Sequence, residues 1–337
     1  MNSRSAAQFA ARHWFRVSPL SLLLAPISWL FRLVVAVRRS LYALGIFKVE
    51  RLSVPVIVVG NLIVGGTGKT PLVAWLAGWL KAQGYRPGIV LRGYAASAES
   101  PREAKPGDSP DVIGDEALLL AETTRCPVWI GRDRASAGKS LLQQHGDCNV
   151  IVSDDGLQHY GLARDLEIAV EDSRGYGNGL LLPAGPLREP AGRRVDATIV
   201  NGPVSSVEHR QFRHGPIFEM RVVPVGFFSM DGAEVPVSVL RGRRLHAVAG
   251  TGNPGRFFTS LRELGLQFVS HEYPDHHAFK PNDLNFEQCD RILMTEKDAV
   301  KCRSFQRDDL VMLRVVAEPD PAFGEYLLKA VHGLPSA

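Results

Sequence analysis

The stretch Val56–Leu80, VIVVGNLIVGGTGKTPLVAWLAGWL, contains the pattern that decides the fold. A run rich in Val and Ile is typical of a buried strand, a glycine-rich segment follows it, and a predicted helix begins near Thr70. Pro71 suits the first turn of that helix, where a missing N–H does no harm. A strand, a glycine-rich loop and a helix in this order predict a P-loop, the phosphate cradle of many nucleotide-binding proteins.

The glycine-rich segment departs from the usual G-x-x-x-x-G-K-[ST] spacing, because Ile63 stands where the first glycine would be. It still places backbone N–H groups, a lysine and a hydroxyl at a helix N-terminus, which is where phosphates bind. The predicted nucleotide-binding residues are Gly65, Gly66, Thr67, Gly68, Lys69 and Thr70. We therefore expect ATP and Mg²⁺ as cofactors, the alternative being a tight turn that happens to carry a lysine and a threonine.

Short β-branched runs alternate with helical stretches after Arg51. This alternation predicts an α/β fold, a P-loop NTPase-like parallel sheet with helices on both faces. The predicted strands of this part lie near 54–59, 88–92, 127–130, 149–153, 166–170 and 197–200, and the predicted helices near 70–82, 115–123 and 134–144.

The pattern changes after Pro216, where two extended stretches, 217–225 and 235–240, flank a turn at Asp231 and Gly232. This predicts a hairpin-like linker. A smaller α/β unit follows, with predicted strands near 245–249, 267–271, 291–294 and 310–315. The expected domains are a membrane-associating segment at 1–50, a P-loop kinase domain at 51–215, the linker at 216–240 and a smaller α/β domain at 241–337.

Two carboxylates follow the predicted strand at 149–153, namely Asp154 and Asp155. A P-loop protein needs an acidic residue on a neighbouring strand to hold Mg²⁺ directly or through water. We therefore expect one of these two residues to contact the metal. A solvated turn is the alternative.

A phosphotransferase must also accept a proton from the acceptor hydroxyl, usually with a carboxylate that a histidine can assist. Asp115 and Glu116 begin a predicted helix, and His276 and His277 lie in a compact loop of the second unit. If both units meet at the nucleotide, a carboxylate of one can contact an imidazole of the other. Helix capping by Asp115 and a plain surface loop at the histidines are the alternatives.

Two further motifs point to other functions. Gly250, Gly252 and Gly255 satisfy G-x-G-x-x-G, with Glu272 where a ribose-binding acid would lie, as in an NAD-dependent oxidoreductase. The sequence TEKD at 295–298 is similar to the guanine-reading N-K-x-D of P-loop GTPase-type regulatory switches, but no residue separates its lysine from its aspartate. Both motifs are weaker evidence than the P-loop.

The positive charge of the chain is concentrated near its N-terminus. The net charge of the 337 residues is only +4, which does not indicate nucleic-acid binding. The basic residues up to position 51, opposed only by one glutamate, are Arg4, Arg12, Arg16, Arg32, Arg38, Arg39, Lys48 and Arg51. The four cysteines are scattered without metal-ligand or disulfide spacing, so a reducing cytosol fits best.

The N-terminal segment is apolar as well as basic. Its uncharged run at 17–31 is shorter than the roughly 20 residues that cross a bilayer, and Pro19 and Pro26 fit a helix interior poorly. From Pro26 onward, apolar residues recur every three or four positions, which predicts an amphipathic helix on a membrane surface. An ordinary docking helix and a signal peptide or anchor are the alternatives.

Seven short motifs are spread along the chain: VGNLIVGGTGKTP at 59–71, LRGY at 91–94, GDEALLL at 114–120, SDDGLQH at 153–159, GPLREP at 185–190, PDHH at 274–277 and TEKDAVK at 295–301. Together they resemble the tetraacyldisaccharide 4'-kinase family of lipid A biosynthesis. The resemblance covers nearly the whole chain, and that family also lacks the first P-loop glycine.

The resemblance implies an enzyme at the cytoplasmic face of the inner membrane. It would transfer the γ-phosphate of ATP to the 4'-hydroxyl of a tetraacyl glucosamine disaccharide 1-phosphate, a membrane lipid, with no nucleic acid and no obligate protein partner. A substrate with four acyl chains stays in the bilayer, so the N-terminal helix would bring the enzyme to it.

The resemblance also implies residue roles. Asp115 with His276 would activate the acceptor hydroxyl, and Lys69 would hold the terminal phosphates. The residues that would serve Mg²⁺ are Thr70, Glu116, Asp154 and Asp155. The residues that would line the region where nucleotide and sugar meet are Arg92, Tyr94, Arg134, Gln158, His159 and Arg188, with Arg132 competing with Arg134 for one position.

Overall fold

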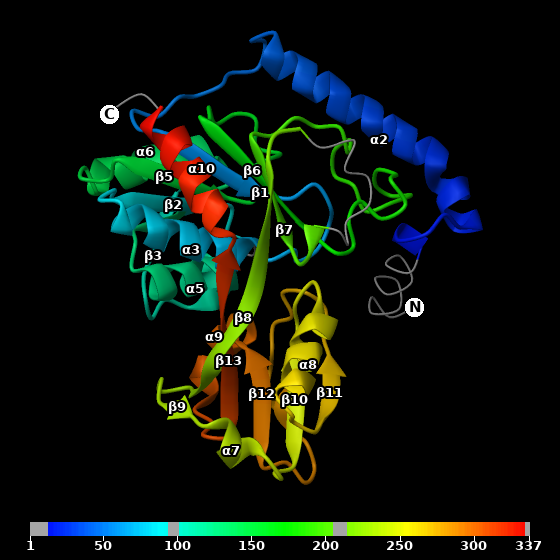
Figure 1. The fold of residues 1–337 in the computed structure, drawn as a ribbon, viewed down its shortest axis with the longest axis vertical. Coiled ribbons are helices and arrows are strands. Elements are labelled where there is room, and N and C mark those ends of the chain that lie inside the picture. The colour runs from blue at the N-terminus through cyan, green and yellow to red at the C-terminus, as the bar shows by residue number, and fades with distance from the viewer. Residues whose placement is uncertain (1–12, 94–100, 205–213, 334–337) are drawn as a thin grey trace.

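The strands of this protein form one continuous mixed sheet that runs through two lobes (Figure 1). The computed structural model describes residues 13–93, 101–204 and 214–333. Within them the strand order is β11-β10-β12-β13-β8-β7-β6-β1-β5-β2-β4-β3, with β9 paired to β8. The predicted α/β class, with a P-loop-type sheet and a smaller C-terminal α/β part, is confirmed.

The larger lobe, here called the P-loop lobe, is a mainly parallel sheet with helices on both faces. Its strands are β1 Val56–Gly60, β2 Pro87–Leu91, β3 Arg102–Ala104, β4 Val128–Ile130, β5 Val150–Asp154, β6 Leu166–Asp172 and β7 Ala197–Asn201. Its helices are α3 Lys69–Ala82, α4 Pro110–Ile113, α5 Asp115–Thr124 and α6 Arg134–Gln144. The bounds of the predicted elements lie within a few residues of the predicted ones, whereas β3 and α4 were not predicted.

Strand β1 explains why this sheet needs cover on both faces. All five of its residues are buried. Ile57 and Val59 pack into the apolar cluster of α3 and α5, whereas Val56 and Val58 pack into the cluster that contains Leu141 of α6. Successive side chains of a strand point to opposite faces, so an uninterrupted apolar run requires helices on both.

Two long antiparallel strands connect the lobes. Strand β8, Ile217–Ser229, begins parallel to β7 and then pairs along most of its length with β13, Leu310–Pro319. The predicted turn does join β8 to β9, Glu234–Val235. The predicted extended stretch beyond β9 is wrong, since α7 occupies Val237–Leu240 after Pro236, which cannot donate to a ladder.

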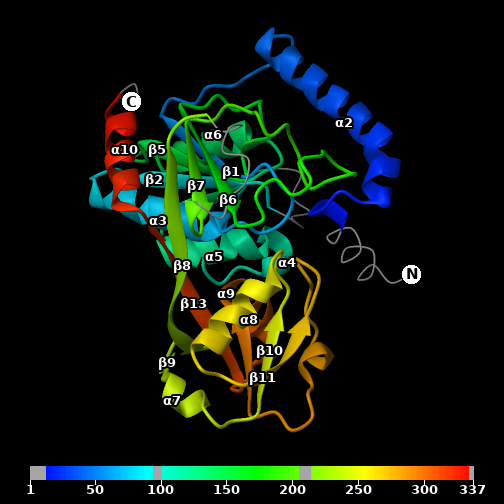
Figure 2. The ribbon, with the colours of Figure 1, turned by 45° about the vertical axis from the view of Figure 1, so that its right-hand side comes forward.

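The smaller lobe, here called the C-terminal lobe, contains a parallel sheet of β10, β11 and β12 beside β13. Its remaining elements are β10 Leu245–Ala249, α8 Pro254–Glu263, β11 Phe268–Glu272, the 3₁₀ turn η3 Pro281–Leu284, β12 Arg291–Thr295, α9 Glu296–Cys302 and the 3₁₀ turn η4 Arg303–Phe305. The chain then returns along β13, and α10, Pro321–His332, packs on the P-loop lobe (Figures 1 and 2).

Helix α2, Pro19–Ala43, projects from the P-loop lobe (Figure 2). Its 25 residues include Pro26, and its length and apolar composition are sufficient to cross a membrane. The expectation that this segment is too short to cross a bilayer is therefore wrong. Pro19 lies in the first turn, where it is tolerated, and Pro26 does not end the helix. Ser21 and Ser28 are its two buried residues.

Candidate active site

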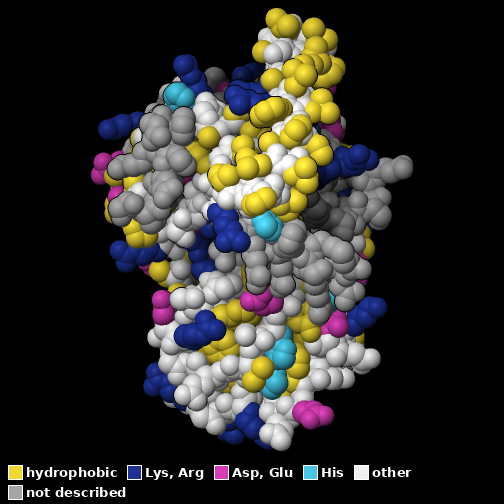
Figure 3. Space-filling model, turned by 90° about the vertical axis from the view of Figure 1, so that its right-hand side faces the viewer, with side chains coloured by type: hydrophobic (Ala, Val, Ile, Leu, Met, Phe, Trp, Pro, Cys, Tyr) yellow, Lys and Arg dark blue, Asp and Glu magenta, His cyan; other side chains and the backbone are white. Residues whose placement is uncertain are grey.

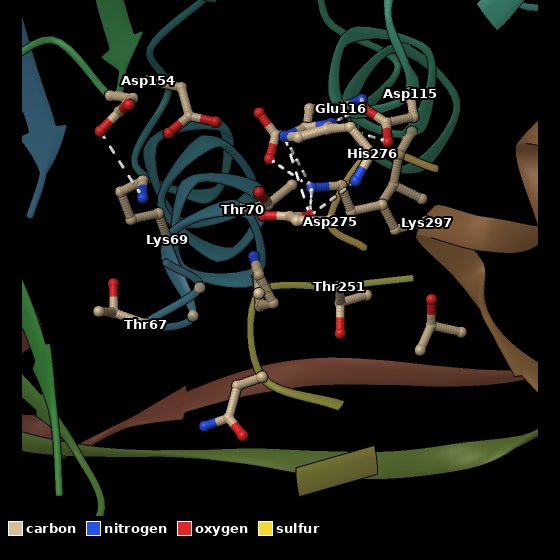
Figure 4. A pocket seen from close by; sticks show the side chains of 18 of the residues that line it. Thr67, Lys69, Thr70, Asp115, Glu116, Asp154, Thr251, Asp275, His276 and Lys297 are labelled. Carbon is tan, nitrogen blue, oxygen red and sulfur yellow. Dashed lines mark hydrogen bonds and ion pairs between the residues drawn. The ribbon is translucent and has the colours of Figure 1, made fainter. Parts of the chain in front are cut away.

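A cavity of about 1900 Å³ lies where the two lobes meet. The P-loop, the start of α5 and the end of β5 line it from the P-loop lobe, and residues 251–254, 256–257, 272–276 and 295–297 line it from the C-terminal lobe. Figure 4 shows Lys69 and Thr70 at the start of α3, with Asp115, His276 and Lys297 grouped farther along the cavity. A cavity of this size exceeds what one small ligand usually fills.

Side chains hold the P-loop by its carbonyl groups. The Gly65 carbonyl accepts from Asn61 Nδ2 at 3.0 Å, the Gly66 carbonyl from Arg174 Nη2 at 2.6 Å, and the Thr67 carbonyl from Asn201 Nδ2 at 3.0 Å. In a trans peptide the C=O and the following N–H point in opposite directions. The N–H groups of the loop are therefore directed away from these three side chains, as a phosphate cradle requires.

Gly68 shows why the motif needs glycine at its end. Its φ of 99° is in the left-handed region, and a Cβ there would lie 2.4 Å from Asn201 Nδ2. Lys69 begins α3 directly after it. The helix N-terminus and the lysine are thus placed together at one end of the cavity.

Asp155 lies among cations rather than alone. Its carboxylate is 3.6 Å from Lys69 Nζ and accepts two hydrogen bonds from Arg188 Nη1 at 3.0 and 2.9 Å. Burial raises the pKa of Asp155, but the charges of Lys69 and Arg188 outweigh it and bring that pKa to about 2. Arg134 Nη2 donates a hydrogen bond to the backbone carbonyl of Asp155. Asp155 is therefore ionised and positions Lys69.

Asp154 is the better-suited metal ligand of the two. It is 2% exposed, and its Oδ1 has no hydrogen-bond partner. Burial, followed by the nearby charge of Glu116, raises the pKa of Asp154. A buried carboxylate oxygen without a partner fits a cation, and Mg²⁺ usually takes few protein ligands beside phosphate and water. No group of three or more His, Cys, Asp or Glu suited to a metal occurs among the residues described.

Asp115 and His276 meet across the lobe boundary. Nδ1 of His276 lies 3.1 Å from each carboxylate oxygen of Asp115, which also accepts from the N–H of Glu116. Burial raises the pKa of Asp115, but the hydrogen bond from His276 and the charge of Lys297 outweigh it and lower that pKa to about 2. The neighbouring His277 contacts Asp283 instead.

Lys297 joins this group, and sequence reasoning gave it no role. Its Nζ lies 2.9 Å from Glu116 Oε1, 3.2 Å from Asp275 Oδ1 and 3.4 Å from His276 Nε2. Burial lowers its pKa, but the surrounding carboxylates, Glu116 first, outweigh burial and raise that pKa. The only signal in the sequence was its position just after a strand, in TEKD.

Most of the predicted sugar-region residues line the cavity. Gln158 Nε2 donates to the Asn61 carbonyl at 3.1 Å and to Glu189 Oε1 at 2.9 Å, so it also braces the loop after β1. Burial lowers the pKa of His159 to about 4. Tyr94 lies outside the described residues. The residues of this set that line the cavity are Arg92, Arg132, Arg134, Gln158, His159 and Arg188.

The arrangement places phosphate-binding groups at one part of the cavity and a carboxylate–imidazole pair at another, so a nucleotide phosphate and an acceptor hydroxyl can meet between them. This is the site of a P-loop phosphotransferase. A sequence model of the family described as tetraacyldisaccharide-1-P 4'-kinase (LpxK) matches residues 20–332. The chain belongs to this family, as its motifs predicted.

Individual relatives agree with this assignment. The tetraacyldisaccharide 4'-kinase of Azoarcus is 48% identical, covering 99% of both chains, and that of Methylobacillus flagellatus is 43% identical, covering 96% of both. The crystal structure of LpxK from Aquifex aeolicus in complex with ATP is similar with a TM-score of 0.79 and 32% identity, covering 93% of this chain and 98% of that one. The GTPase and oxidoreductase alternatives are therefore not retained.

Proposed function

We propose that this chain transfers the γ-phosphate of ATP to the 4'-hydroxyl of a tetraacyl glucosamine disaccharide 1-phosphate, at the cytoplasmic face of the inner membrane. Membership of the kinase family supports the reaction. The observation that carries the proposal is the Asp115–His276 pair, which lies in the same cavity as Lys69 and Thr70. Nucleotide and acceptor sites in one cavity are what direct transfer requires.

The P-loop lobe binds the donor. The loop N–H groups hold the phosphates, and Lys69, kept in place by Asp155, approaches the terminal ones. Thr70, Asp154 and Glu116 would hold Mg²⁺, with Asp155 acting mainly on Lys69. When bound, this ion neutralises the charge that develops on the transferred phosphoryl group.

The Asp115–His276 pair accepts the proton of the 4'-hydroxyl as a unit. Asp115 is buried and ionised, and it orients the imidazole through Nδ1, which leaves Nε2 on the side of Lys297 and Asp275. Arginines that line the cavity, among them Arg92 and Arg134, suit the anionic headgroup of the acceptor.

Helix α2 would bring the enzyme to its lipid substrate. Exposed apolar side chains gather on the face of α2 that Figure 3 shows, and Arg38 near the end of the helix also lines the active-site cavity. An exposed apolar helix with flanking cations binds the surface of anionic membranes. This arrangement supports membrane docking that presents the sugar headgroup to the cavity.

Replacing Asp115 tests the catalytic assignment. Asp115→Asn should lower transfer by about 10²–10⁴-fold, the usual contribution of general acid–base catalysis. ATP affinity, measured by calorimetry, should remain that of the wild type, because Asp115 does not belong to the phosphate cradle. Asp111→Asn, at an exposed position one turn earlier in the chain, is the control. Near-normal turnover by Asp115→Asn would exclude this pair as the base.

A further inference from the structure

The loop Thr251–Asn253 of the C-terminal lobe belongs to the G-x-G-x-x-G motif that phosphoryl transfer does not explain. We propose that this loop packs against the P-loop and holds it in the conformation that binds triphosphate. Both lobes would then be needed for the triphosphate site. Gly252 and Arg256 are the residues that position the P-loop. The proposal concerns ATP binding alone and does not depend on the roles of Asp115 and His276.

The closest approach is between two backbones. A Cβ placed on Gly252 would lie 2.4 Å from the nitrogen of Gly66 and 3.2 Å from the carbonyl carbon of Gly65. Real Cβ atoms essentially never come as close as 2.4 Å to a heavy atom outside their own chain neighbours. Only glycine at 252 therefore allows the two loops to touch in this arrangement, and the contact falls on Gly65 and Gly66 of the P-loop.

A side chain makes a second contact across the same boundary. Arg256, in the first turn of α8, donates from Nη2 to the carbonyl of Asn201 at 3.1 Å. Asn201 in turn holds the Thr67 carbonyl and lies beneath Gly68. The C-terminal lobe thus supports the P-loop from two sides, at Gly66 directly and at Thr67 through Asn201.

The supporting loop is itself fixed within its own lobe. The N–H of Gly250 donates to Asp298 Oδ2 at 2.9 Å, and Asp298 also contacts Thr295 Oγ1 at 2.8 Å and Lys301 Nζ at 2.7 Å. Asp298 is completely buried. A loop anchored in this way can hold the P-loop in a fixed position, and Asp298 of the sequence TEKDAVK supplies the anchor.

Gly252 is therefore explained by its contact with the P-loop and does not require a dinucleotide site. Gly252 permits contact with Gly66, whereas a Cβ at Gly255 would meet only Asn253 Oδ1, at 3.8 Å. The two positions belong to one motif but differ in what a methyl group would touch. They provide a matched pair for an experiment.

The test measures binding of ATP and of inorganic triphosphate to the full-length protein by calorimetry. Gly252→Ala should lower the affinity for both ligands by about tenfold or more, because the added methyl group would collide with the backbone of the P-loop and displace it. The affinity for ATP and the affinity for triphosphate should fall by the same factor, since the displaced P-loop contacts only the phosphates. Gly255→Ala should bind both as the wild type does, and the melting temperature of each variant checks folding.

Arg256→Met keeps the apolar stem and removes the contact with Asn201. It should also weaken both ligands, and its effect should combine non-additively with that of Gly252→Ala, because both act on one loop. The proposal would be overturned if Gly252→Ala bound ATP and triphosphate with wild-type affinity, or if Gly255→Ala lowered these affinities as much as Gly252→Ala does. If Gly252→Ala fails to fold, Arg256→Met decides alone: unchanged affinity for triphosphate then overturns it.

Discussion

The imidazole of His276 lies among groups that act on its pKa in opposite directions. The hydrogen bond to Asp115 raises it most, burial and the charge of Lys297 lower it, and the net effect is an increase above 6.5. A protonated imidazole cannot accept another proton. We therefore expect kcat/KM for the acceptor to fall as the pH decreases through this raised pKa.

The measurement is the pH profile of kcat/KM at saturating ATP and Mg²⁺. The acidic limb should have an apparent pKa above the ordinary value of about 6.5. Binding of ATP alone, measured at the same pH values, is the control for changes in the phosphate cradle. A profile without an acidic limb in this range would show that His276 does not titrate with the reaction.

Several charged residues of the site, and the pairing of Asp115 with His276, could be predicted from the sequence, but Lys297 and the contacts that hold the P-loop could not. Lys69, Asp115, Asp154 and His276 stand in recognisable local patterns. Lys297, in contrast, contacts Glu116 across 181 positions of sequence, and Asn201 contacts Thr67 across 134. These pairs form because the topology of the sheet places α9 against α5 and the end of β7 beside the P-loop.

Helix α2 is the element with the most exposed apolar surface. Leu23, Leu30 and Leu33 are 74%, 61% and 59% exposed. Replacing all three by serine should lower partitioning into anionic vesicles by roughly 1,000-fold or more, because burial of each leucine contributes roughly 1.5–3 kcal/mol and each 1.4 kcal/mol is a factor of about ten. Co-sedimentation with vesicles measures this effect.

The control for this prediction carries serine at Val239 and Val269, which are also exposed but lie in the C-terminal lobe. It should sediment with vesicles as the wild type does. ATP binding should be unchanged in both proteins. Equal partitioning of the α2 variant and the wild type would contradict membrane docking through this helix.

Helix α10 contributes to stability rather than to the site. Phe323 is completely buried, and its ring lies 5.7 Å from that of Trp75 and 5.4 Å from that of Phe218. Phe323→Ala should lower the free energy of unfolding by about 3–5 kcal/mol, the usual cost of such a cavity. Glu325→Ala, on the exposed side of the helix, should have little effect in the same denaturant titration.

Elements with a strong local pattern were predictable, and those decided by their neighbours were not. Strand β1 is apolar throughout, and β10 has the bounds that its sequence predicts. The pairing of β8 with β13 and the position of α10 had no local signal, because β8 and β13 lie about 90 residues apart and Phe323 of α10 packs on Trp75, about 250 positions away. The length of helix α2 was underestimated, because only the uncharged run before Arg32 was counted.

The whole molecule places two lobes around one cavity and joins them by β8 and β13 (Figure 1). The P-loop and Asp154 come from one lobe, and His276 and Lys297 come from the other. The division into domains at 50, 215 and 240 stays a prediction, and the continuous sheet means that β8 belongs to both lobes.

Transfer of labelled γ-phosphate tests the central claim most directly. The purified chain is incubated with γ-labelled ATP, Mg²⁺ and the tetraacyl disaccharide 1-phosphate in mixed micelles, beside an acceptor whose 4'-hydroxyl is blocked. We expect the label on the intact acceptor and none on the blocked one. No transfer to the intact acceptor, or equal labelling of both, would contradict the proposed reaction.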